Sequence, residues 1–269
     1  MSVESRVERH GAVERLWMAH APLGRPLYWT TCHLADGVLV DTGCARGRPA
    51  LQAFLAQRRV EAVLTTHEHE DHVGNHAVVD APAYAPARAA DILRDGPPRL
   101  PLYRWLTWGA HEAAPRPARP LAERIEAGGR WWRVVPTPGH SGDHVAYLDE
   151  SSQAAFTGDA YLGKLRAVRA KEDVPLQMES VRRIAALDPA TLHPAHGPVL
   201  ARPRARLLEV ADHFDRLREK ALRLHERGLS PRRIRQELMG PEPWLCWYSQ
   251  GAFSAENLVR SLLRAPPRP

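Results

Sequence analysis

The chain has 269 residues, of which 44% are hydrophobic and 25% charged, and a net charge of +6. This composition is that of a globular protein and excludes a disordered, collagen-like or coiled-coil chain. No stretch approaches the roughly 18 consecutive apolar residues of a membrane span, and the first eleven residues lack the apolar core of a secretory signal. The three cysteines, Cys32, Cys44 and Cys246, give no disulfide framework, so we expect a cytoplasmic protein without a membrane partner.

The first eighty residues are predicted to form short strands with one helix between them. Asp36-Gly37 lies between two apolar runs, a pattern typical of a tight β-hairpin. The predicted strands cover 27–34, 38–41, 60–64 and 77–79, and the predicted helix covers 48–58.

Residues 82–120 differ in character from the segments on either side. They contain eight prolines together with Tyr103, Trp105 and Trp108. Because proline interrupts both helices and strands, we expect a loop-rich insertion with one or two short helices.

Strand patterns resume after the insertion, and helical periodicity dominates the last quarter of the chain. The alternation of short strands and helices over residues 1–200 predicts an α/β fold. We place a domain boundary so that 1–203 form one domain and 204–269 a helical C-terminal domain. The predicted strands are 131–135, 145–148, 154–156 and 191–192, and the predicted helices are 175–187, 204–227, 230–239 and 254–264.

The densest group of polar residues follows the strand predicted at 60–64. The run from His67 to His72 places three histidines and an aspartate within six residues, and imidazole with carboxylate is a donor set that Zn²⁺ prefers. His67 and His69 are two apart in an extended segment and point the same way. Asp71 and His72 follow a bend and can face a second ion. The alternative is a His-rich polar loop, which the position directly after a strand disfavours.

This motif resembles that of the metallo-β-lactamase superfamily, and four further elements of that family's pattern occur in order. They are Asp41 in Leu-Val-Asp-Thr-Gly, His140 in Thr-Pro-Gly-His, Asp159 in Thr-Gly-Asp, and His196 before a glycine. The resemblance covers residues 36–198. It implies a four-layer αββα sandwich, here with a C-terminal helical extension.

The resemblance also implies a role for each of these residues. One ion would be held by His67, His69 and His140, a second by Asp71, His72 and His196, and Asp159 would bridge the two. Asp41 would hydrogen-bond to the ligand loops rather than bind metal. His193 and His144 lie close in sequence to implied ligands, but their contexts match the pattern less well. The two ions would be Zn²⁺, with iron or manganese as alternatives for the same ligands.

The implied chemistry is hydrolysis of a small molecule. Two ions about 3.5–4 Å apart hold a bridging hydroxide that attacks an ester, thioester or lactone carbonyl. Asp71 would orient this nucleophile and Asp159 would hold both ions. The motifs are most similar to the hydroxyacylglutathione hydrolase and lactamase-like branch. Glu68 replaces a histidine usual in that enzyme, and residues 160–164 lack its glutathione contact.

The substrate pocket is predicted from the aromatic residues. Insertions at 82–120 usually overhang the cleft in this family, so Tyr103, Trp105 and Trp108 would line a pocket for an acyl or aryl group. Tyr161, two residues after Asp159, is a further candidate. The alternative is that these aromatic side chains cover the outer face of the sheet or a contact in a homodimer.

The C-terminal segment allows a function of another class. Residues 201–269 hold 14 basic and 8 acidic side chains, whereas residues 1–200 hold 23 of each. Related endoribonucleases carry a small C-terminal helical domain, so the alternative is a metal-dependent endoribonuclease that holds RNA on this segment. Acidic residues at helical spacing from the arginines favour a solvated helix surface instead. The arginines concerned are Arg202, Arg204, Arg206, Arg216, Arg218, Arg223, Arg232, Arg233 and Arg235.

Overall fold

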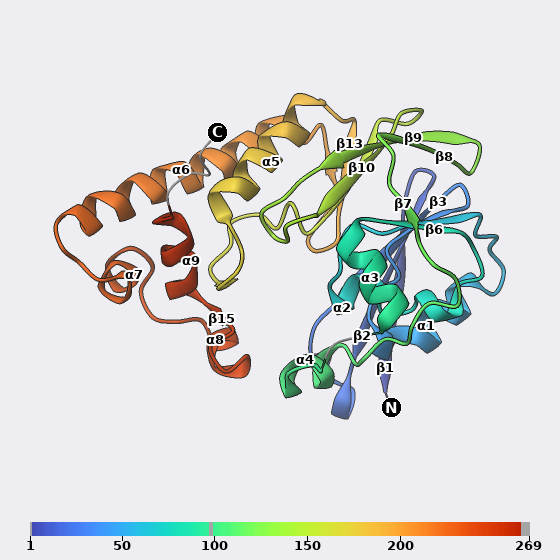
Figure 1. Ribbon diagram of the computed structural model, residues 1–269, viewed down its shortest axis with the longest axis horizontal. Coiled ribbons are helices and arrows are strands. Elements are labelled where there is room, and N and C mark those ends of the chain that lie inside the picture. Colours follow the sequence, from blue (N-terminus) through green and yellow to red (C-terminus); the bar gives the residue numbers. More distant parts are fainter. Residues whose placement is uncertain (1, 97–98, 265–269) are drawn as a thin grey trace.

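The computed structural model describes residues 2–96 and 99–264. Two β-sheets pack face to face, and helices cover the outer face of each sheet (Figure 1). This arrangement confirms the predicted four-layer αββα sandwich. The layers follow from the sequence most clearly at Val145–Asp149 and Ala154–Gly158, strands buried on both faces, which offer one apolar side to the other sheet and one to the helices.

The first sheet has seven strands in sequence order. Strands β1 to β4 form an antiparallel meander, and β4 to β7 are parallel. The predicted hairpin is confirmed, because Asp36 and Gly37 both have positive φ, 44° and 81°, as tight hairpins require. The strands are β1 (Val3–His10), β2 (Val13–His20), β3 (Thr30–Ala35), β4 (Val38–Val40), β5 (Ala62–Leu64), β6 (Ala83–Ala85) and β7 (Arg119–Pro120).

The second sheet has six strands in the order β14-β13-β11-β10-β9-β8. All its neighbours are antiparallel except β11 and β13, which are parallel. Its strands are β8 (Arg124–Ala127), β9 (Arg130–Pro136), β10 (Val145–Asp149), β11 (Ala154–Gly158), β13 (Thr191–Pro194) and β14 (Leu200–Ala201).

The hydrophobic core lies in three layers. Between the sheets, Leu64, Trp132 and Phe156 are fully buried in one cluster. On the outer face of the first sheet, α1 (Arg48–Leu55) buries Leu51 and Phe54. On the outer face of the second sheet, α5, α6 and α9 form the third layer; they cover Val174–Ala186, Arg204–Glu226 and Ala255–Leu262.

One predicted strand needs correction, and further strands were not predicted from the sequence. The strand predicted at 77–79 is instead a 3-10 helix, η3 (His76–Val78), because His76 turns inward and bonds to Thr65 at 3.0 Å. Strands β1 and β8 were not predicted, because both alternate with charged residues and lack an apolar run. Strand β2 was missed because its apolar residues lie next to that polar stretch.

Residues 82–120 contain two short helices, as predicted for this insertion. These are α3 (Ala87–Asp95) and α4 (Leu102–Thr107), while Pro97 and Pro98 lie outside the described residues. The two ends of the insertion form β6 and β7 and so extend the first sheet. The insertion is therefore anchored in the sandwich at both ends.

The C-terminal segment begins inside the sandwich. Helix α6 buries Leu207, Val210 and Phe214 against α5, and α7 (Pro231–Met239), α8 (Trp244–Tyr248) and α9 follow it. A two-stranded sheet joins β12 (Val168–Arg169) to β15 (Phe253–Ser254). The division at residue 203 stays a prediction. No helix within residues 2–96 and 99–264 is long and apolar enough to cross a membrane.

Candidate metal centre

The implied ligands lie on loops that follow strand ends of both sheets. Strand β5 leads into His67 and His69, and the short helix α2 (Glu70–Val73) carries Asp71 and His72. The other three come from the second sheet: His140 precedes β10, Asp159 follows β11, and His196 follows β13. The facing sheets therefore bring residues that are far apart in the sequence into one cluster.

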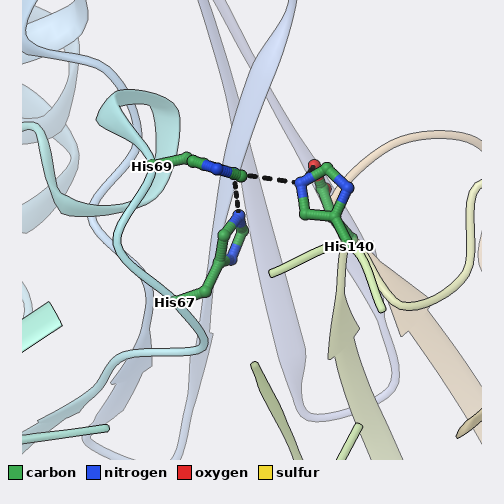
Figure 2. A group of neighbouring side chains, drawn as sticks. His67, His69 and His140 are labelled. Atoms are coloured by element: carbon green, nitrogen blue, oxygen red, sulfur yellow. Dashed lines mark hydrogen bonds and ion pairs between the residues drawn. The ribbon is translucent and has the colours of Figure 1, made fainter. Parts of the chain in front are cut away.

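The first donor group consists of His67, His69, His140 and Asp159, whose ligand atoms lie within 4.8 Å of one another. Nδ1 of His69 lies 2.6 Å from Nε2 of His67 and 3.0 Å from Nε2 of His140 (Figure 2). Nε2 of His140 is 3.1 Å from Oδ2 of Asp159. Three imidazole nitrogens and a carboxylate oxygen thus converge as a tetrahedral metal site requires.

The second donor group consists of Asp71, His72, His196 and the same Asp159. Oδ1 of Asp159 is 3.4 Å from Nε2 of His72 and 3.5 Å from Nε2 of His196. Oδ2 of Asp71 lies 3.5 Å from Nε2 of His196. Asp159 therefore turns one carboxylate oxygen toward each donor group.

The unpaired atoms of the second group fit a metal ion. Nε2 of His72, Nε2 of His196 and Oδ1 of Asp159 are buried and have no hydrogen-bond partner among the described residues. Burying polar atoms without partners is costly. A cation held between them would satisfy all three at once, so the donor chemistry and the geometry agree.

A layer of hydrogen bonds orients these ligands. Asp41 accepts hydrogen bonds from the Thr66 backbone N–H and the Thr66 hydroxyl, both at 2.8 Å, and it lies 2.7 Å from Nδ1 of His72. The Thr66 hydroxyl is also 3.0 Å from Nδ1 of His67. Asp41 thus contacts the ligand loop, in the position that the resemblance implied, and is not in either donor group.

His144 holds the backbone of Asp159 in place. Its Nε2 accepts a hydrogen bond from the Asp159 backbone N–H at 3.2 Å, and its Nδ1 lies 2.8 Å from the Thr137 hydroxyl. The preceding residue, Gly158, has φ 46°, and a Cβ there would come within 2.7 Å of the Thr66 hydroxyl oxygen. Glycine is therefore required at this turn.

His193, which lies three residues before the implied ligand His196, is outside both donor groups. It stacks on Phe156 with ring centroids 5.0 Å apart and contacts the Thr191 hydroxyl at 3.1 Å. It is a buried core residue. The structure thus brings together all seven residues that the resemblance implied as ligands.

The protonation states of the histidines differ. Burial, together with the charge of neighbouring His72, holds the pKa of His67 well below its usual range. Burial and the nearby Arg169 do the same for the pKa of His69. For His140, burial is outweighed by the carboxylates of Asp159 and Glu172, which raise its pKa to about 9. The first two imidazoles are therefore neutral and ready to coordinate a cation, whereas His140 must release a proton.

A cavity of about 400 Å³ opens beside the cluster, with Asp71, His140 and Asp159 on its wall. Tyr103 and Trp108 line it, as expected from the sequence. Most of the remaining wall is apolar and includes Leu27, Leu162, Leu165, Ala167, Leu245 and Phe253.

The other two candidate pocket residues lie elsewhere. Trp105 is 46% exposed and stacks on the guanidinium of Arg46, because it is two residues from Tyr103 and so faces the opposite side of α4. Tyr161 is buried in the core beneath α5 and α6. Its neighbour Leu162 reaches the cavity instead.

Comparison with known proteins agrees with this geometry. The sequence profile of the metallo-beta-lactamase superfamily matches residues 33–196, more than half of the chain. The chain belongs to the metallo-beta-lactamase superfamily. Its members are generally hydrolytic and typically bind divalent metals.

Among superfamily relatives, a lactamase-like protein of Penicillium aethiopicum is 34% identical over 61% of this chain and 48% of its own. An atrochrysone carboxyl ACP thioesterase of Aspergillus fumigatus is 30% identical over 70% of this chain and 56% of its own. The chain thus spans about half the length of these fungal relatives. The beta-lactamase-like protein 2 homolog of Caenorhabditis elegans is 28% identical over 87% of this chain and 78% of its own.

Solved structures support the superfamily fold. A metallo-beta-lactamase family protein from Thermus thermophilus has a TM-score of 0.67 at 24% identity and covers 92% of this chain and 91% of its own. A beta-lactamase domain protein from Burkholderia ambifaria has a TM-score of 0.69 at 22% identity and covers 97% of this chain and 87% of its own. The aligned part of this chain, 92% and 97% of its residues, is longer than residues 1–203 alone. The similarity of fold therefore extends into the C-terminal helices.

Several residues of the site were not predicted from the sequence. Tyr28 lines the cavity and packs edge-on against His196, with ring centroids 5.1 Å apart. Trp244 and Tyr248 of α8 also line the cavity, although they lie in the C-terminal segment. Arg169 and Glu172 flank His140. None of these residues belongs to a spaced motif, so only the tertiary structure reveals them.

Proposed function

We propose that this protein is a metal-dependent hydrolase that cleaves an ester, thioester or lactone carbonyl of a small acyl or aryl substrate. The single observation that carries the proposal is the bridging position of Asp159. One carboxylate joins two donor groups at the wall of an apolar cavity. This arrangement is the one required for two cations to act together on a bound carbonyl.

The donor set fits two Zn²⁺ ions, with iron or manganese as alternatives. When bound, such ions activate water as a nucleophile and polarise the carbonyl. His67, His69 and His140 would hold one ion, and Asp71, His72 and His196 the other, with Asp159 shared. Asp71 lines the cavity and is placed to orient the attacking water.

The cavity favours an apolar acyl group. Tyr103, Trp108, Tyr248 and Phe253 give it an aromatic lining, which binds flat or long hydrophobic groups by removing their surface from water. The Aspergillus fumigatus relative is named an atrochrysone carboxyl ACP thioesterase. Its name supports thioesters as the first substrates to test.

The endoribonuclease alternative is less well supported. Arginines of α6 are engaged in ion pairs, such as Arg206 with Glu209 and Arg223 with Glu219. Arg235, one of the candidate RNA contacts, is buried and donates a hydrogen bond to the backbone oxygen of Gly240. Paired and buried arginines offer fewer contacts to a phosphate backbone.

A hydrolysis panel on protein loaded with Zn²⁺ tests the proposal. It should compare aryl and alkyl thioesters, aryl esters, lactones, β-lactams and a short single-stranded RNA. We expect turnover of a thioester or ester that disappears in Asp159→Ala and persists in Asp80→Ala, since Asp80 is 86% exposed and outside the site. RNA cleavage faster than that of any ester, and equally dependent on Asp159, would overturn the proposal.

A variant of the basic C-terminal segment tests the endoribonuclease alternative in the same experiment. Changing the exposed Arg232 and Arg233 to Gln removes two cations from α7. If the segment holds RNA, the salt dependence of RNA binding must become shallower. We expect no change in thioester hydrolysis and little change in RNA binding.

A further inference from the structure

Arg169 lies against the first donor group but is not a ligand. Its Nη2 is 2.9 Å from Nδ1 of His69 and 3.2 Å from Nε2 of His140. Its Nε donates a hydrogen bond to Oε1 of Glu172 at 3.0 Å. These contacts use Nε and Nη2 and leave Nη1 out. One nitrogen of the guanidinium is therefore available beside the first donor group.

The fold holds this side chain in place. Arg169 is in β12, directly opposite Phe253 of β15, and its guanidinium lies 5.2 Å from the Phe253 ring centroid. The backbone oxygen of Glu172 accepts hydrogen bonds from the Ser261 hydroxyl and from Arg264. The C-terminal segment thus fixes both Arg169 and its carboxylate partner, and the side chain of Arg169 is only 17% exposed.

Arg169 also lines two cavities. It lines the apolar cavity, and it lines a second cavity of about 590 Å³ that includes Arg88, Ser141 and Lys171. His140 and Glu172 are likewise common to both cavities. The Arg169 side chain is therefore on the wall of both cavities next to the first donor group.

The chemistry of the guanidinium points to an anion as its ligand. Nδ1 of His69 and Nε2 of His140 belong to the first donor group, so a bound cation would occupy the two nitrogens that Nη2 contacts here. Nη1 and Nη2 would then both need an acceptor. Two adjacent N–H donors on a planar guanidinium match the two oxygens of a carboxylate. Arg104, the other arginine common to both cavities, is already paired with Glu70.

We propose that Arg169 is a carboxylate-binding residue of this site. The inference rests on the proposed function for the source of the ligand: either the acid that hydrolysis releases or an acidic group on the substrate. Both sources share the same chemistry, a carboxylate next to an apolar group. Glu172 and Phe253 act on this ligand through Arg169 and are positioning residues.

Equilibrium binding to Zn²⁺-loaded protein tests the proposal without turnover. The probes are 2-naphthoate and its neutral analogue 2-naphthamide, measured by calorimetry, with the metal content of every variant determined. In Arg169→Met we expect naphthoate binding to weaken about 10- to 100-fold, the usual effect of losing charge-assisted hydrogen bonds. Naphthamide binding should be unchanged. Arg166→Met, which removes an exposed arginine three residues away, should alter neither.

A second variant covers the case in which Arg169→Met loses metal or fails to fold. Arg169→Lys keeps the charge but lacks the planar pair of donors, so naphthoate affinity should fall less than in Arg169→Met. Unchanged naphthoate affinity in a metal-loaded Arg169 variant would overturn the proposal. So would equal weakening of naphthoate and naphthamide.

Kinetics with matched thioesters distinguish the two sources. If the carboxylate belongs to the substrate, Arg169→Met should raise KM for a succinyl thioester but not for a butyryl thioester. If it belongs to the product, KM for both should stay unchanged while inhibition by the product acid weakens. Absence of hydrolysis in wild-type protein would contradict the proposed function, whereas naphthoate binding through Arg169 would still be measurable.

Discussion

Asp41 and His72 are 31 residues apart in the sequence, yet Oδ2 of Asp41 lies 2.7 Å from Nδ1 of His72. Both side chains are buried. The contact leaves Nε2 of His72 facing the second donor group, where it has no hydrogen-bond partner among the described residues. A carboxylate on one ring nitrogen fixes the tautomer and orientation that the other nitrogen needs as a ligand.

Asp41→Asn should therefore weaken metal binding while leaving all seven donor residues in place. We expect an affinity loss of about 10- to 100-fold, as for other partners of metal-binding histidines. Competition with a chromogenic chelator measures it. Asp80→Asn is the control, and equal affinities of wild type and Asp41→Asn would contradict this role.

Asp159→Ala should disrupt both donor groups at once. The wild-type protein is expected to bind two ions per chain, since seven protein ligands are too many for one tetrahedral ion. The variant should bind fewer ions and lose most hydrolytic activity. Elemental analysis of dialysed samples gives the ratio, with Asp80→Ala alongside. A wild-type value of one ion at saturation would show that the two groups do not act as two sites.

Metal affinity should rise with pH. The carboxylates of Asp159 and Glu172 overcome the effect of burial and raise the pKa of His140 to about 9, so below that pH a cation must displace a proton from this imidazole. Each displaced proton lowers the apparent affinity about tenfold per pH unit below the pKa. Chelator competition between about pH 6 and pH 9 should show this slope. A flat profile would mean that His140 is already neutral.

Trp108 and Trp105 form a matched pair for testing the cavity. Trp108 is buried in the cavity wall, whereas Trp105 of α4 is 46% exposed. Trp108→Ala should raise KM for an aryl thioester about tenfold more than for an acetyl thioester, because it removes apolar contact with the bulky group. Trp105→Ala should leave both KM values close to wild type. A uniform effect of Trp108→Ala on all substrates would indicate a structural role.

The metal centre was largely predictable because its ligands sit in short, dense motifs. His67, His69 and Asp71 closely follow a strand, and a strand end presents such side chains at the edge of a sheet. The resemblance supplied the distant members, His140 and His196. Strand β1 was missed because an edge strand with one solvated face has no apolar run to detect.

The binding surface around the metal centre was not predictable in the same way. Trp105 and Trp108 look equivalent in the sequence, yet Trp105 of α4 is exposed and Trp108, the residue after α4, is buried in the cavity wall. Tyr161 follows the bridging aspartate closely but packs into the core.

The sequence by itself determined the α/β class and the dense His67–His72 motif, because periodic apolar patterns and closely spaced polar residues are local properties; the αββα sandwich and the distant candidate ligands came from the ordered motifs of the family resemblance. The tertiary structure decided what surrounds the metal centre. Pairing of β12 with β15 brings Phe253 against Arg169, although the two strands are far apart in the sequence. Such a contact depends on how the C-terminal helices pack against the second sheet, and no local pattern encodes that packing.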